Sequence, residues 1–134
     1  MHANLSALLK TALSTLVPQA PIAVALSGGA DSVALALVAV EYCAGNPRPL
    51  YFFHVHHGLM SQADGWIAHL QKFSQELNIP LHVRHVQVDL AAGLGVEGAA
   101  RDARYLALAQ LCYEQEVAAL LLAHHRQDQA ETVL

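Results

Sequence analysis

A short apolar run, residues 22–26, breaks into Ser27, Gly28 and Gly29 and then opens a helical segment at Asp31. Two glycines allow a sharp turn and let a ligand approach the backbone without meeting a Cβ. The N–H groups at the start of the following helix lack helical partners, and together with the positive helix end they favour an anion. The lysine of the G-x-x-x-x-G-K-[ST] loop is missing here. The stretch therefore predicts a phosphate loop of a different kind.

Apolar strand-like runs alternate with helical patterns along the whole chain. Strands are predicted at residues 22–26, 50–55, 81–88 and 117–123, and helices at residues 6–17, 31–43, 61–77, 96–115 and 128–134. This alternation implies right-handed crossovers and a doubly wound parallel α/β sheet. We expect the strand order 3-2-1-4, with later strands missing from this sequence. The first and fourth strands then form the switch point, where ligands bind in such sheets.

Composition limits the partners of this stretch. The 134 residues suffice for one domain, and 54% of them are hydrophobic, so some apolar surface is expected to meet a partner. The net charge is −4 and no basic run is present, which leaves little in this stretch to bind nucleic acid. Neither a membrane-spanning run nor a signal peptide is evident, so we expect a cytoplasmic protein. Cys43 and Cys112 match no metal or redox spacing and are expected to be buried thiols.

Four stretches carry a family resemblance. The sequence Ser-Gly-Gly-Ala-Asp-Ser at residues 27–32 resembles the motif of the PP-loop ATP pyrophosphatases, which split ATP between the α and β phosphates and have the adenine nucleotide alpha hydrolase-like fold. Residues 54–59, 95–105 and 123–132 resemble, in this order, one branch of them, the tRNA(Ile)-lysidine synthetases. Because those enzymes are several times longer, we expect residues 1–134 to be the N-terminal part of such an ATP-binding domain.

The resemblance implies an ATP-dependent ligase that joins free L-lysine to C2 of the wobble cytidine of tRNA(Ile) through an adenylated base. ATP and Mg²⁺ are then required, tRNA(Ile) and lysine are the substrates, no membrane is involved, and a homodimer of the longer protein stays open. This stretch alone is expected to be inactive. Two alternatives remain: another PP-loop tRNA-modifying enzyme, such as a cytidine thiolase, and a nucleotide-binding fragment without activity of its own.

The site residues follow from matching positions. A carboxylate beside an anion cradle would repel triphosphate unless a cation intervened, and Mg²⁺ is such a cation. The nucleotide-binding candidates are Ser27, Gly28, Gly29, Ala30, Asp31, Ser32, His54, His57 and Arg104. The catalytic candidates are Arg101, Asp128 and Glu131, and the Mg²⁺ candidates are Asp31 and Asp128. Arg101 could equally pair with Glu97 on a solvated helix face. Gln127 stands where many family members carry a further acid.

Histidines at two predicted strand ends offer a competing interpretation as a transition-metal site. They are His54, His56 and His57 on one loop and His124 and His125 on another. Neighbouring strand residues face opposite ways, and no H-E-x-x-H spacing is present, so we prefer the nucleotide site. We expect His124 to orient the loop, and His56, His82 and His85 to be surface residues.

Overall fold

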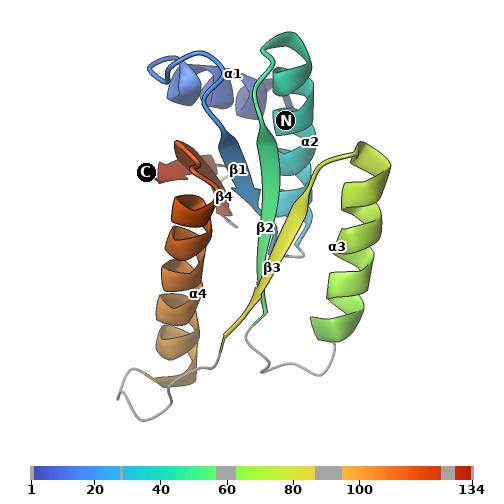
Figure 1. Cartoon of the computed structure of the whole chain (residues 1–134), viewed down its shortest axis with the longest axis vertical. Helices are drawn as coiled ribbons and strands as arrows, with labels where there is room; N and C mark the ends of the chain where they lie inside the picture. The colour runs from blue at the N-terminus through green and yellow to red at the C-terminus, as the bar shows by residue number, and fades with distance from the viewer. Residues whose placement is uncertain (1, 28, 57–62, 87–94, 125–128, 134) are drawn as a thin grey trace.

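One sheet of five strands, in the order β3-β2-β1-β4-β5, organises the computed structural model (Figure 1), which describes residues 2–27, 29–56, 63–86, 95–124 and 129–133. The strands are β1 (Ile22–Ala25), β2 (Leu50–His56), β3 (Leu81–His85), β4 (Ala119–His124) and β5 (Gln129–Val133). The helices are α1 (His2–Leu13), α2 (Ala30–Gly45), α3 (Ala63–Leu77) and α4 (Gly95–Glu114). The predicted α/β class and the order 3-2-1-4 are confirmed.

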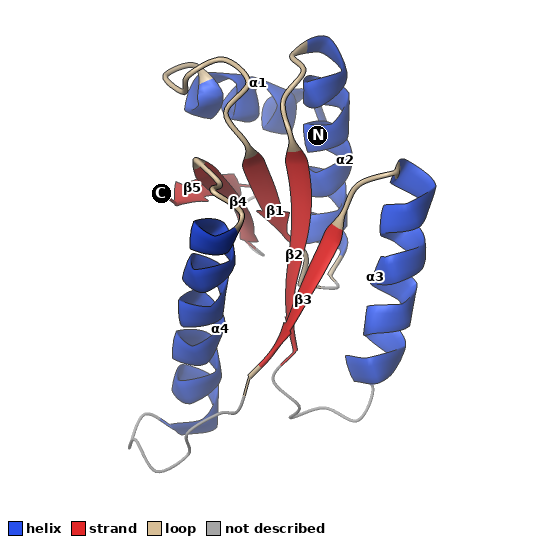
Figure 2. Ribbon diagram, viewed as in Figure 1, coloured by secondary structure: helices blue, strands red, loops and turns tan. Residues whose placement is uncertain are grey.

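The first strand lies at the centre and sets the switch point. Ile22 pairs with Leu50 of β2 on one side and with Ala119 of β4 on the other, and both neighbours run parallel to β1. The chain after β1 turns into α2, whereas β4 is reached from the far side of the sheet through α4 (Figure 2). The carboxyl ends of β1 and β4 therefore meet at one edge, where doubly wound sheets bind ligands.

The alternation of side chains along β1 divides the core into two layers. Ile22 and Val24 face the layer built with α1, α2 and α3, while Ala23 and Ala25 face the layer built with α4. Small alanines on the second face let α4 pack closely against the sheet. The same alternation holds in β2, where Phe52 belongs to the first layer and Phe53 to the second. Continuous apolar strands are thus explained by helices on both faces.

The last segment differs from the prediction. Residues 128–134 were expected to start a helix, but Gln129–Val133 form β5, which runs antiparallel to β4 with Leu122 opposite Glu131. Five residues are too few for a stable isolated helix, whereas the edge of β4 offers backbone partners. Thr132 and Val133 are β-branched and suit a strand. The sheet is therefore mixed at this edge.

The first helix also differs from the prediction. It spans His2–Leu13 instead of residues 6–17, and Pro18 does not end it. The hydroxyl of Ser14 donates to the carbonyl of Thr11 at 2.7 Å, and the Leu16 amide bonds to the Leu13 carbonyl at 3.1 Å, so a turn replaces the last helical turn. None of the helices in the described ranges is long and apolar enough to cross a membrane.

The β3 strand occupies the predicted edge, and its residues Leu81–Arg84 are half-buried. His82 was expected on the surface, but its ring packs against Tyr51 and Phe53, with ring centroids 5.7 and 5.9 Å apart. It points toward the α4 face because it alternates with Leu81, which belongs to the other layer. The imidazole thus packs at the edge of the apolar layer between the sheet and α4.

Candidate nucleotide site

The predicted phosphate loop lies between β1 and α2, at the carboxyl edge of the sheet. Gly29 is the N-cap of α2, with φ −85° and ψ 163°, and its carbonyl accepts the first helical hydrogen bond from the Val33 amide at 3.2 Å. Gly29 has no side-chain oxygen, and no side-chain cap bonds to this helix end. The first-turn amides and the helix dipole thus favour an anion here. Gly28 lies outside the described residues.

The hydroxyl of Ser32 connects the loop internally. It accepts a hydrogen bond from the Ser27 amide at 3.2 Å and donates to the Gly29 carbonyl at 2.9 Å. The hydroxyl of Ser27 lies 3.3 Å from that of Ser32 and accepts from the Gly29 amide at 3.4 Å. Ser32 is only 2% exposed. Its side chain therefore shapes the loop from inside, while Ser27 and Ala30 are exposed to solvent.

Gly29 does not make the turn possible, contrary to the expectation from sequence. Its φ of −85° lies in a region open to every residue, and a Cβ built on it would lie 3.6 Å from Oγ of Ser27, an ordinary contact. Chain geometry alone does not demand glycine at this position. A need for glycine arises only if a ligand approaches the backbone there.

His54, a predicted nucleotide-binding residue, contacts the backbone just before this loop. Its Nδ1 lies 2.6 Å from the carbonyl oxygen of Leu26, the residue before Ser27. The Leu26 amide in turn donates to the carbonyl of Phe53 at 2.7 Å. The side chain is 8% exposed. The sequence analysis did not predict this bond, although the alternation of Leu50, Phe52 and His54 along β2 already indicated that the His54 side chain lies on the same face as α2.

The carboxyl end of β4 is the other side of the switch point, and residues 125–128, which follow it, lie outside the described residues. The register of β1 against β4 pairs Val24 with Leu121, and β4 ends three residues later at His124. His57 and Asp128 lie outside the described residues. Glu131 lies on β5 opposite Leu122. The helix predicted at this position is therefore wrong.

Arg101 and Arg104 lie in the first half of α4, on the face of the sheet opposite α2. Arg101 is exposed, and its guanidinium lies 5.7 Å from the centre of the Tyr105 ring, one turn further along. Arg104 is half-buried, and burial lowers the pKa of its guanidinium from the ordinary value, with a smaller opposite effect from Tyr105. A guanidinium still remains a cation at neutral pH. The predicted pairing of Arg101 with Glu97 involves a side chain outside the described set.

Asp31 provides the carboxylate expected for a cation. It lies in the first turn of α2, next to the loop. In the part of the chain that is described, no group of three or more histidine, cysteine, aspartate or glutamate side chains could hold a metal ion. His56 and His85, level with each other on β2 and β3, have ring centroids 4.9 Å apart. His85 is exposed as expected, and His56 is half-buried.

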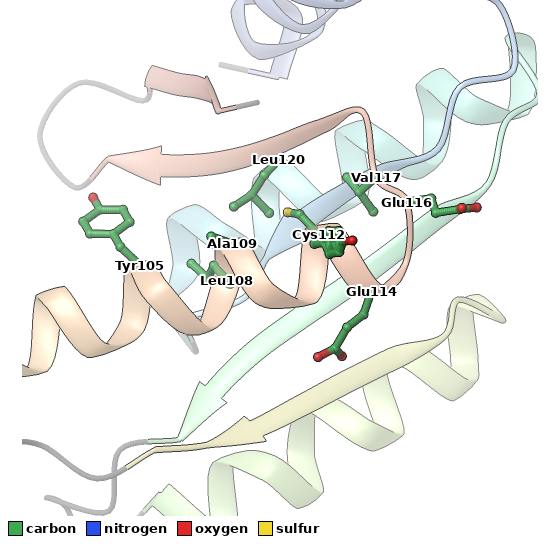
Figure 3. A pocket seen from close by; sticks show the side chains of 9 residues that line it. Tyr105, Leu108, Ala109, Cys112, Glu114, Glu116, Val117 and Leu120 are labelled. Carbon is green, nitrogen blue, oxygen red and sulfur yellow. The ribbon is translucent and has the colours of Figure 1, made fainter.

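A groove of about 870 Å³ runs between α4 and β4, on the face opposite α2 (Figure 3). Figure 3 shows Tyr105 near the arrowhead of β4 and Val117 at the other end of the groove. Its floor includes Leu108 and Leu120, which belong to the core layer under α4. The described residues that line this groove include no arginine or lysine, and they lie outside the phosphate loop.

The loop, the switch point and the sheet order define a nucleotide-binding α/β domain of the PP-loop class. The chain matches the PP-loop domain family over residues 1–134 and belongs to it. The resemblance seen in the motifs is thereby confirmed, and use of ATP follows for this domain.

Curated relatives of known name share about half of their aligned residues with this chain. The chain is 50% identical over 115 residues to the tRNA(Ile)-lysidine synthase of Ralstonia nicotianae, covering 84% of this chain and 25% of the relative. It is 50% identical over 117 residues to the tRNA(Ile)-lysidine synthase of Bordetella pertussis, covering 86% of this chain and 36% of the relative. The chain thus spans about a quarter to a third of the length of these relatives.

Two solved structures share the fold. A U34-tRNA thiolase from Methanococcus maripaludis, solved with its 4Fe-4S cluster, has a TM-score of 0.74 and 23% identity, over 92% of this chain and 45% of the thiolase. An NH3-dependent NAD synthetase from Campylobacter jejuni has a TM-score of 0.61 and 12% identity, over 91% of this chain and 53% of the synthetase. At these identities the likeness concerns the fold alone.

Proposed function

We propose that this chain is the ATP-binding part of a cytoplasmic tRNA(Ile)-lysidine synthetase, a ligase that attaches free L-lysine to C2 of the wobble cytidine of tRNA(Ile). The observation that carries the proposal is the N-terminus of α2, whose N-cap Gly29 makes no side-chain cap bond, at the switch point of a PP-loop domain. Two relatives that share half of their aligned residues with this chain are named tRNA(Ile)-lysidine synthase, and these names support the choice of substrate.

The proposed reaction has two steps. First, the cytosine C2 oxygen attacks the α-phosphorus of ATP, and pyrophosphate leaves into the cradle formed by residues 27–32. The amine of lysine then attacks C2, and AMP departs with the oxygen. Backbone amides set in advance toward the leaving pyrophosphate stabilise charge as it develops, which is where such donors contribute most.

Each candidate residue has a role in this scheme. Mg²⁺, when bound, would offset the negative charge of the phosphates, and Asp31 and Asp128 would hold it. Arg101 and Arg104 would bind phosphate or the adenylate as permanent cations, and Arg101 is the one exposed to solvent. Glu131 would be a further catalytic residue. Because the charge of this stretch is −4, most tRNA phosphate contacts belong to the remainder of the longer enzyme.

Calorimetric titration with ATP, with and without Mg²⁺, tests the nucleotide site. We expect saturable binding that Mg²⁺ strengthens and that Asp31→Ala weakens. Glu41→Ala is the matched control, because Glu41 is an exposed carboxylate on the same helix, near its opposite end. Equal binding by wild type and Asp31→Ala would remove Asp31 from the site. Transfer of labelled lysine to tRNA(Ile) by the longer protein tests the reaction itself.

One competing function stays open from the sequence, that of a PP-loop tRNA thiolase. That chemistry needs cysteines that carry sulfur or a cluster. Cys43 lies near the end of α2 and Cys112 near the end of α4, and both are half-buried free thiols. Because α2 and α4 begin at the carboxyl edge, both thiols lie far from the loop. Sulfur in place of lysine in the product tRNA would establish the thiolase instead.

A further inference from the structure

The peptide group that joins Leu26 to Ser27 is fixed on both of its polar sides. Its carbonyl oxygen lies 2.6 Å from Nδ1 of His54, on the neighbouring strand β2. Its N–H donates to the hydroxyl of Ser32, on the first turn of α2, at 3.2 Å. This peptide is the point where the central strand becomes the phosphate loop. Its orientation is therefore set jointly by β2 and α2.

The contact with His54 defines the state of its ring. A carbonyl oxygen can only accept a hydrogen bond, so Nδ1 carries the proton and donates it to Leu26. The imidazole is 8% exposed, on the same face of β2 as Phe52. A ring enclosed in this way has little freedom to move, so the bond transmits the position of β2 to the end of β1.

We infer that His54 is a positioning residue for phosphate binding: its Nδ1–H holds the Leu26–Ser27 peptide so that the loop and the first turn of α2 present their amides in a fixed direction. The inference rests on the proposed function and assigns His54 no direct contact with nucleotide. Preset donors need no reorganisation when the pyrophosphate charge develops. A small displacement of such groups costs much activity.

Two amide substitutions separate positioning from mere packing. In His54→Asn the side-chain amide nitrogen is attached to Cγ, as Nδ1 is in histidine, so it can still donate to Leu26. In His54→Gln the amide lies one bond further out, near the place of Nε2, and the bond to Leu26 is lost. We expect His54→Asn to retain most of the activity of the longer protein and His54→Gln to lose roughly tenfold or more in kcat/KM for ATP.

The binding probes are pyrophosphate and adenosine, measured separately with the longer protein. If His54 positions the loop, His54→Gln weakens pyrophosphate binding roughly tenfold or more and leaves adenosine binding nearly unchanged. A general loss of structure would weaken both. His82→Asn is the matched control, because His82 is a half-buried histidine on β3 that packs on the opposite face. We expect this control to bind both probes like wild type.

The outcomes separate the two proposals. Wild type that binds neither ATP nor pyrophosphate contradicts the proposed function. Wild type that binds both, together with a His54→Gln variant that binds pyrophosphate equally well, contradicts the positioning role alone. If His54→Gln does not fold, which its circular dichroism would reveal, His54→Asn decides. A folded His54→Asn that binds pyrophosphate tenfold more weakly than wild type also contradicts the proposed bond.

Discussion

The amide of Ser27 donates to the side-chain oxygen of Ser32 at 3.2 Å, and this bond closes the phosphate loop from within. The same hydroxyl donates to the Gly29 carbonyl at 2.9 Å, so one side chain satisfies backbone groups of both Ser27 and Gly29. Ser32 is 2% exposed, which leaves water little access to replace these bonds. The conformation of the loop therefore depends on a buried side chain.

Ser32→Ala should lower both stability and phosphate binding. The substitution leaves the Ser27 amide without its acceptor in a part-buried place, which costs about 1–3 kcal/mol. Urea unfolding measures the first effect and pyrophosphate titration the second. Ser14→Ala is the control, because the Ser14 hydroxyl also bonds to a carbonyl but is exposed, and its loss should change stability by about 0.5 kcal/mol or less. Equal losses in the two variants would contradict the role of Ser32.

Gly29→Ala should separate folding from binding. The backbone at Gly29 suits alanine, which gains about 0.4–1 kcal/mol from a less flexible unfolded chain, while alanine is a poorer N-cap by a similar amount. Stability should thus change by about 1 kcal/mol or less, but the added methyl group should obstruct phosphate and weaken ATP binding. Gly45→Ala, at the other end of α2 with no atom within 4 Å of the new Cβ, should leave binding unchanged. A Gly29→Ala variant with full affinity would show that the ligand stays away from this backbone.

The sequence predicted the sheet because its strands carry a two-sided apolar pattern. Residues 22–26 and 117–123 are apolar at every position, which is typical of strands covered on both faces, and alternate residues of β1 and β4 indeed belong to core layers on opposite faces. The edge position of β3 followed from its mixed pattern. The bond between His54 and Leu26 could not be predicted, because it depends on the stagger of β2 against β1, which local pattern does not encode.

Two segments whose structure depends little on their local sequence, the end of α1 and the segment that forms β5, were predicted less well. The end of α1 was misplaced because Ser14 bonds back to Thr11, a contact that competes with the helix and that residue type alone leaves open. The segment after Asp128 has helix-compatible residues, but the open edge of β4 recruits it as β5. Edge pairing is a long-range effect, and propensity within a short window does not contain it.

The two arginines of α4 should respond differently to substitution. Arg101 is exposed, so Arg101→Ala should change stability by about 0.5 kcal/mol or less but lower kcat/KM of the longer protein roughly tenfold or more. Arg104 is half-buried, so Arg104→Ala should lower stability as well, through lost packing of its aliphatic stem.

A cation outside the site provides the comparison for both arginines. Arg84 pairs with Glu114 at 2.5 Å across β3 and α4, in a pair that is partly exposed on both sides. Arg84→Ala should change stability by about 1 kcal/mol or less and leave lysine transfer unchanged. Thermal unfolding and steady-state kinetics measure the two effects. Arg101→Ala with wild-type kinetics would remove Arg101 from the catalytic machinery.

The two thiols should make stability depend on alkaline pH. Burial raises the pKa of Cys43, with a smaller opposite effect from Arg48, and burial raises the pKa of Cys112. In the unfolded chain each thiol ionises near its ordinary pKa, whereas in the folded chain it stays protonated at that pH. The folded state then binds more protons, so the free energy of unfolding falls as pH rises through the interval between the two values.

Urea unfolding between about pH 7 and pH 10 measures this effect, with ordinary thiols ionising near pH 8.5. Wild type should lose stability above that value more steeply than the Cys43→Ala, Cys112→Ala double variant, whose two side chains cannot ionise. Below about pH 7 the difference between the two proteins should be constant, because both thiols are then protonated in either state. Parallel curves over the whole range would mean that folding leaves the thiols as free to ionise as in the unfolded chain, and that the burial of Cys43 and Cys112 is too shallow to affect their charge.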